Sequence, residues 1–201
     1  MTLRRAAWIL VGLAALGLVL FVALRPGAPA PPSGALAIGG PFQLIDQSGR
    51  SVDQRILKGR WSAVFFGYTF CPDVCPTTLQ TLATAQQGLG AQAKDFQVVF
   101  VTVDPARDTP AQLKAYLSSD SFPKGAIGLT GTTAQVAAIT RAYGVYFQKQ
   151  GTGPDYSVNH SSAIYLMKPN GAYDSVVSAG LTPDQTRDAI LRAMNGRSSP
   201  S

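Results

Sequence analysis

Hydrophobic positions between residues 41 and 195 form continuous apolar runs as well as runs with helical spacing. Two of the continuous runs are WSAVFFGY at 61–68 and FQVVFVTVD at 96–104. Runs of this kind are typical of strands that are buried on both faces of a sheet. A third run, SAIYLMK at 162–168, is followed by a Pro-Asn-Gly turn and YDSVVSAG, which predicts an antiparallel hairpin. FQLIDQSGRSV alternates around a Ser-Gly turn and predicts a smaller hairpin.

Helical spacing follows the first strand and recurs later in the chain. Leu79, Leu82 and Leu89 predict a helix that runs to about Ala93. Three later helices are expected to begin at a threonine cap, in two cases with proline as the first helical residue. These caps are Thr109 before Pro110, Thr132 or Thr133 before a helix that stops at Gly144, and Thr182 before Pro183. VYFQK at 145–149 is a further candidate strand.

The order β-α-β-α-(α)-β-β-α predicts an α/β fold, a thioredoxin-like sandwich with a central mixed sheet. In this arrangement strand 61–68 is central, strand 96–104 lies parallel on one side, and strand 162–168 lies antiparallel on the other. Neighbouring strands are about 4.8 Å apart. Groups at the ends of the first two strands and at the start of the third are therefore expected to converge on one patch.

The N-terminal region carries an apolar segment of a different kind. Residues 6–24 contain neither a charge nor a proline and lie between Arg4-Arg5 and Arg25. A helix of this length spans about 28 Å, close to the ~30 Å hydrocarbon core of a bilayer. A cleaved signal peptide usually has a shorter apolar region, about 7 to 15 residues. We therefore expect residues 1–25 to be a retained membrane anchor, with the paired arginines favouring a cytoplasmic N-terminus and an exported body.

The remaining chain divides into a tether, a domain and a tail. Residues 26–40 are rich in proline and glycine and predict an extended tether. The folded domain is expected at 41–195, followed by a disordered tail at 196–201.

The net charge of +6 includes three arginines beside the apolar segment. The expected exported part therefore contains 14 of the 17 basic residues and 11 acidic residues. Because these basic residues are scattered, we expect no nucleic-acid binding.

Candidate chemistry gathers where the topology brings strand ends together. Cys71 and Cys75, the only cysteines, follow the first strand, and His160, the only histidine, precedes the third. Asp104 ends the second strand, although it is equally well explained as a strand stop and loop former before a proline. Arg107 and Asp108 are expected to organise the start of the next helix. A permanent disulfide is the structural alternative for the cysteines, but so small a ring constrains the unfolded chain little.

The residue types favour a soft metal ion. Thiolates select Cu(I), zinc or iron–sulfur clusters, and imidazole suits copper and zinc. Structural zinc sites have four protein ligands, whereas Cys71, Cys75 and His160 supply three. Backbone N–H groups at the start of the following helix would favour the thiolate form. Copper is the best single inference from these ligands, and the spacing alone does not exclude zinc.

Three segments of the sequence resemble the Sco/SenC family of membrane-anchored copper proteins: GYTFCPDVCPTTL at 67–79, VTVDPARDTP at 101–110 and NHSSAIYLMKPNG at 159–171. The resemblance implies a thioredoxin-like fold and copper, as Cu(I), Cu(II) or both, held by Cys71, Cys75 and His160. It also implies that the two cysteines form a redox-active disulfide and that Asp104 is linked to the metal site or to a partner surface.

The same resemblance implies delivery of copper to the CuA centre of cytochrome c oxidase. The expected partner is the CuA-bearing subunit, with another periplasmic copper chaperone or a thiol reductase as further candidates. The expected location is the bacterial inner membrane, with a single span and the C-terminal domain in the periplasm. We interpret the protein as a metallochaperone rather than an enzyme in the strict sense. The alternatives are a thiol–disulfide oxidoreductase that reduces the CuA cysteines and a redox sensor.

Overall fold

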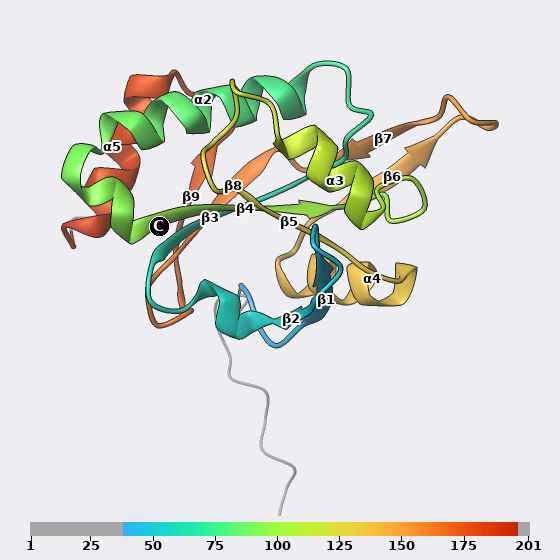
Figure 1. Cartoon of the computed structure of the whole chain (residues 1–201), viewed down its shortest axis with the longest axis horizontal. Coiled ribbons are helices and arrows are strands. Elements are labelled where there is room, and N and C mark those ends of the chain that lie inside the picture. The colour runs from blue at the N-terminus through green and yellow to red at the C-terminus, as the bar shows by residue number, and fades with distance from the viewer. Residues whose placement is uncertain (1–37, 197–201) are drawn as a thin grey trace, which may run out of the picture. The chain divides into compact units, whose positions relative to one another are not determined.

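A seven-stranded mixed sheet forms the centre of the computed structural model, which describes residues 38–196 (Figure 1). Its strand order is β2-β1-β5-β4-β3-β8-β9. The strands are β1 Gln43–Asp46, β2 Ser51–Asp53, β3 Trp61–Gly67, β4 Phe96–Thr102, β5 Ile127–Thr130, β8 Ala163–Met167 and β9 Tyr173–Ser178. β3 pairs parallel with β4 and antiparallel with β8, and both predicted hairpins, β1–β2 and β8–β9, are antiparallel. The predicted central strand and its two neighbours are therefore confirmed.

Strand β5 is an element that the sequence pattern did not predict. It pairs parallel with β4 and antiparallel with β1, so it joins the first hairpin to the rest of the sheet. The strand has only four residues, and one of them is Gly128, a residue type depleted in strands. A Cβ on Gly128 would lie 2.7 Å from Cδ1 of Leu117 and 3.3 Å from Cβ of Leu113, so glycine suits the close approach of a helix here.

Four α-helices and two 3₁₀-helices complete the described fold. They are η1 Gln54–Leu57, α2 Val74–Gly88, η2 Gly90–Asp95, α3 Pro110–Leu117, α4 Thr133–Ala142 and α5 Pro183–Met194. Thr109, Thr132 and Thr182 are the N-caps of α3, α4 and α5, and each side chain accepts a backbone N–H in the first turn, as predicted. The helix expected to reach Ala93 is shorter, because α2 ends at Gly88 and η2 continues the chain in a tighter turn.

The helices cover both faces of the sheet, with α2, α3 and α5 on one side and α4 on the other (Figure 1). Phe100 of β4 packs toward the face covered by α2, α3 and α5, and its ring centroid lies 5.8 Å from that of Tyr116 in α3. Phe66 of β3 points the other way, and its ring lies 5.2 Å from that of Tyr143 at the end of α4. This explains why β3 and β4 are continuous apolar runs rather than alternating ones.

A separate hairpin extends from the body of the fold, at the right of Figure 1. It consists of β6 Phe147–Gln150 and β7 Ser157–His160, which pair only with each other in the described sheet topology. The candidate strand around 145–149 is confirmed in β6, whereas β7 was not predicted. His160 is the last residue of β7 and is paired with Phe147, so the two side chains lie on the same face of the hairpin.

No helix within residues 38–196 is long and apolar enough to cross a bilayer. The expected anchor at 1–25 lies outside the described residues. So do almost all of the expected tether and tail.

Candidate metal centre

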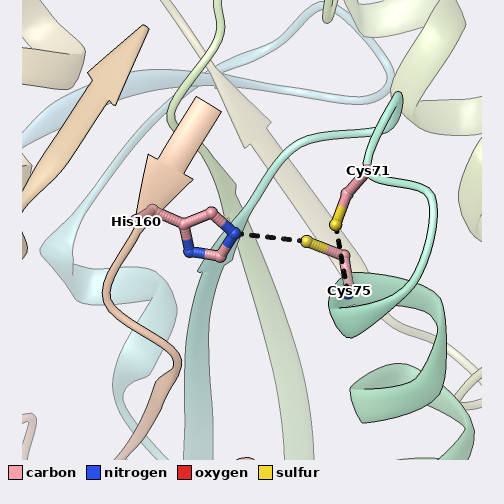
Figure 2. A group of neighbouring side chains, drawn as sticks. All are labelled: Cys71, Cys75 and His160. Atoms are coloured by element: carbon pink, nitrogen blue, oxygen red, sulfur yellow. Dashed lines mark hydrogen bonds between the residues drawn. The ribbon is translucent and has the colours of Figure 1, made fainter. Parts of the chain in front are cut away.

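Cys71, Cys75 and His160 lie together beyond the C-terminal end of β3 (Figure 2). Their ligand atoms all lie within 4.8 Å of one another. Sγ of Cys75 is 3.5 Å from Nε2 of His160, and the backbone N–H of Cys75 donates to Sγ of Cys71 at 3.4 Å. Neither cysteine is part of a disulfide. The topology thus brings together two side chains 85 residues apart, and their role as metal ligands stays a prediction.

The two cysteines have different surroundings because one lies in a loop and the other in a helix. Cys71 follows a turn in which its N–H donates to the carbonyl of Tyr68 at 3.2 Å. Cys75 is the second residue of α2 and is fully buried, whereas Cys71 is only half-buried. A molecule that approaches this centre from solvent therefore reaches the sulfur of Cys71 first.

The thiols are also electrostatically unlike. The side-chain hydrogen bond with Cys75 lowers the pKa of Cys71 from 9.0 to about 3, against the opposing effect of burial. Hydrogen bonds from His160 and from the N–H groups of Asp73 and Cys75 add to this effect. The pKa of Cys75 is raised by its hydrogen bond to Cys71 and by its burial. At neutral pH the pair therefore holds one thiolate, on Cys71, and one thiol, on Cys75.

The imidazole of His160 is oriented by its backbone neighbour and by two aromatic rings. Nδ1 lies 3.0 Å from the carbonyl oxygen of Ser161. With the proton on Nε2 the imidazole donates to Cys71, whereas a proton on Nδ1 donates to that carbonyl and leaves the Nε2 lone pair directed at the sulfurs, which is the form that binds a metal ion. The rings of Phe65 and Tyr68 meet the imidazole edge-on at centroid distances of 6.5 and 5.9 Å.

Asp108 is a residue of the site that sequence reasoning assigned only to the start of α3. Its carboxylate is fully buried and accepts hydrogen bonds from the N–H and Oγ1 of Thr69, at 3.0 and 2.7 Å, and from Oγ1 of Thr102, at 2.6 Å. Burial raises the pKa of Asp108. Because Thr69 is two residues before Cys71, this carboxylate ties the cysteine loop to the end of β4.

Asp104 forms its hydrogen bonds with residues other than the two cysteines and His160. Its carboxylate accepts from Nε of Arg107 at 2.5 Å and from the hydroxyl of Tyr156 at 2.7 Å. Its own N–H donates to Oγ1 of Thr102. Asp104 thus links the loop after β4 to the loop between β6 and β7.

The donor set fits a soft metal ion. Cys71, Cys75 and His160 are the one group of three or more histidine, cysteine or acidic side chains with metal-binding proximity in the described chain. Two sulfurs and one imidazole nitrogen suit copper and zinc, and three donors fall short of the four of a structural zinc site. The fold and the site together define a thioredoxin-like protein whose C-x-x-x-C pair faces a histidine.

Comparison with known proteins places the chain within a family. The SCO1/SenC family model matches residues 30–195, which is most of the chain. The protein therefore belongs to the SCO1/SenC family, as the sequence resemblance predicted.

Three relatives illustrate the extent of the similarity. The mitochondrial SCO1 homolog 1 of Arabidopsis thaliana is 36% identical over 173 residues, which are 85% of this chain but only 50% of that protein. The structure of Bradyrhizobium japonicum ScoI with copper bound is 42% identical, with a TM-score of 0.71, and the match covers 78% of this chain and 99% of that one.

BsSco, a member of the Sco family of cytochrome c oxidase assembly proteins in which a disulfide switch was identified, is 25% identical. Its TM-score is 0.62, with 80% of this chain and 95% of that one covered. These structures confirm the thioredoxin-like fold with a central mixed sheet.

Proposed function

We propose that this protein is a copper metallochaperone that delivers copper to the CuA site of cytochrome c oxidase. The observation that carries the proposal is the convergence of Cys71, Cys75 and His160 within 4.8 Å. Support comes from ScoI, a relative at 42% identity with copper bound, and from BsSco, which belongs to a family of oxidase assembly proteins.

The site accounts for both uptake and release of the copper cargo. Cys71 is already a thiolate at neutral pH, and Cys75 gives up its proton when its sulfur becomes a ligand. His160 supplies the nitrogen donor. Thiol–disulfide exchange with a disulfide of another protein transfers two electrons to that disulfide and joins Cys71 to Cys75, which leaves neither sulfur able to hold the metal.

The proposed location follows from the apolar segment at 6–24. As a retained single span in the bacterial inner membrane it holds the domain in the periplasm, where the CuA-bearing subunit is the acceptor. Another periplasmic copper chaperone is the proposed donor, and a thiol reductase keeps the cysteines reduced.

One observation favours a second function, reduction of the CuA cysteines by thiol–disulfide exchange. The half-buried Cys71 is a thiolate while the buried Cys75 is a thiol. This is the arrangement of an attacking and a resolving thiol. It differs from thioredoxin-type enzymes in having three residues between the cysteines instead of two.

The test of the primary proposal is copper binding by the full chain in two redox states. Anaerobic, reduced protein should bind one copper per chain, and the disulfide form should bind none, because metal and oxidation compete for the same sulfurs. Cys71→Ser and Cys75→Ser should each lose tight binding. Copper binding that survives complete oxidation of both cysteines would show that the metal sits elsewhere.

A further inference from the structure

The two halves of the candidate centre belong to different parts of the fold. Cys71 and Cys75 follow β3, a central strand of the seven-stranded sheet, whereas His160 ends β7 in the separate hairpin β6–β7 (Figure 1). The ladder hydrogen bonds of β7 run to β6 and not to the main sheet. His160 is tied to the main sheet through the short connection to β8, which pairs with β3, and the remaining hold on the hairpin comes from side-chain contacts with the body.

Arg107, in the loop after β4, contacts both halves. Its guanidinium carbon lies 3.6 Å from the ring centroid of Tyr156, beside β7, and 4.7 Å from that of Phe70, the residue before Cys71. Its Nη1 donates to the carbonyl of Pro154 at 3.3 Å. Cation–π contacts of this kind stabilise most when the cation is withdrawn from water, and only 16% of the Arg107 side chain is exposed.

The ring of Tyr156 lies against two cations, Arg107 and Lys149, and its hydroxyl forms a hydrogen bond with Asp104. Nζ of Lys149 lies 3.6 Å from the ring centroid, a second cation on the same aromatic ring. The hydroxyl donates to Asp104 at 2.7 Å, and the other oxygen of Asp104 accepts from Arg107 at 2.5 Å. Nη2 of Arg107 is buried without a hydrogen-bond partner among the described residues. The guanidinium is therefore held jointly by its hydrogen bonds to Asp104 and Pro154 and by its stacking against the Tyr156 and Phe70 rings.

We propose that Asp104, Arg107 and Tyr156, called here the Arg107 clasp, are positioning residues that fix hairpin β6–β7 against the cysteine loop. The clasp sets the distance from Nε2 of His160 to the two sulfurs. This inference rests on the proposed function, since it concerns the copper site, and it gives Asp104 a role without making it a ligand. No member of the clasp belongs to the candidate ligand group, and each acts through the position of His160.

Copper affinity of the reduced full chain provides the first test. Arg107→Met keeps the length of the side chain but removes the charge and the planar group, and should weaken binding by about 10- to 100-fold, as supporting residues around metal ligands typically do. Tyr156→Phe removes only the hydroxyl and should cause a smaller loss. Arg107→Lys keeps the charge without the stacking geometry and should fall between wild type and Arg107→Met.

Tyr146→Phe is the matched control for Tyr156→Phe. Tyr146 lies directly before β6, is 61% exposed, and its hydroxyl donates to Gln148 of the same hairpin instead of to Asp104. Removing this hydroxyl should leave copper affinity unchanged. An equal loss in both tyrosine variants would overturn the clasp, because any hydroxyl on the hairpin would then matter.

A double-mutant cycle separates positioning from general destabilisation. In a His160→Ala background, Arg107→Met should cause no further loss of copper affinity, because the ligand through which the clasp acts is gone. The reduction potential of the Cys71–Cys75 pair should remain that of wild type in Arg107→Met. A loss in the His160→Ala background as large as in the wild-type background would overturn the inference.

Amide hydrogen exchange of the reduced, metal-free chain supplies a test without copper. In Arg107→Met, amides of Ser157–His160 should exchange about 10-fold faster while those of β3 and β4 stay unchanged, as expected for local opening of a weakly held element. Absence of copper binding by wild-type protein would defeat the proposed function and leave this test intact. Unchanged exchange in the hairpin would overturn the clasp, whatever the copper result.

Discussion

Gly67 and Cys75 pack so closely that a Cβ on Gly67 would lie 2.8 Å from the sulfur of Cys75. The same atom would lie 2.8 Å from Cε2 of Phe100. The last residue of β3 is therefore glycine because α2 places a sulfur where a side chain would otherwise be. A glycine within a strand often marks such a close approach, and here the approaching group is a candidate metal ligand.

Gly67→Ala should displace Cys75 or Phe100, both of which are fully buried. Overpacking of this kind costs about 1–3 kcal/mol, and a shifted sulfur should also weaken copper binding. Denaturant unfolding and copper competition would measure the two effects. Gly180→Ala is the control, because a Cβ there would meet only Oγ of Ser178 at 3.7 Å. Equal behaviour of the two variants would contradict the packing argument.

His160→Ala separates the metallochaperone from the thiol–disulfide oxidoreductase. A site that loses one of three ligands should lose copper affinity steeply, by at least the 10- to 100-fold typical of changes beyond the ligands themselves. Thiol exchange needs two sulfurs and no imidazole, so the reduction potential should stay close to wild type. The measurements are the CuA content of oxidase in cells carrying the variant and the potential of the purified protein. An intact copper centre at normal variant levels would favour the oxidoreductase.

The lowered pKa of Cys71 predicts an unusual alkylation profile. The rate for Cys71 should stay nearly flat between about pH 5 and pH 8, because the thiolate persists down to its pKa of about 3. For a thiol with a pKa of about 8.5, the alkylation rate would fall close to tenfold for each unit by which the pH is lowered. Iodoacetamide labelling followed by peptide mapping measures this, with urea-unfolded protein as the control. A tenfold fall per unit in the folded protein would contradict the assignment.

The same shift predicts how stability depends on pH. Between about pH 3 and pH 9 the unfolded chain binds a proton at Cys71 that the folded chain does not, so this group's contribution to the free energy of unfolding rises with pH. The contribution is lost as pH falls through the folded pKa. Cys75 titrates above this window because its pKa is raised. The stability difference between wild type and Cys71→Ser should therefore grow from pH 4 to pH 8.

Asp108 should tolerate asparagine but not alanine. Alanine leaves the N–H of Thr69 and two threonine hydroxyls without their acceptor, at about 1–3 kcal/mol for each buried group left unpaired. Asparagine can accept two of these bonds and donate to the remaining hydroxyl. Unfolding of both variants in denaturant, with copper affinity alongside, measures the difference. Equal destabilisation by the two substitutions would mean that the charge, not the hydrogen bonds, holds the loop.

The apolar segment at 6–24 should keep the protein in the membrane. A reporter fused after Ser201 should be active only when the C-terminus is exported, and the protein should remain in the membrane fraction. Replacing two leucines of the segment with arginine should release it, since each arginine at a span centre costs about 2.5–3.5 kcal/mol on insertion scales. Mature protein that begins beyond residue 24 in a soluble extract would indicate cleavage instead.

Local pattern was sufficient for much of the fold. The runs at 61–68 and 96–104 became β3 and β4 because strands buried on both faces need apolar residues at every position. β5 and β7 were missed for a physical reason. Each has four residues, and what makes them strands is pairing with a partner far away in the chain or across a hairpin, which no short window of sequence contains.

The sequence by itself determined the donor types, the family and the meeting of the cysteines with His160, because strand order places those ends together. Tertiary structure alone decided how the acidic side chains divide their roles, with Asp108 holding the cysteine loop and Asp104 holding Arg107 and Tyr156. It also decided which cysteine is the thiolate. Hydrogen bonds and burial act over a few ångströms between residues remote in sequence, so these assignments exist only once the chain has folded.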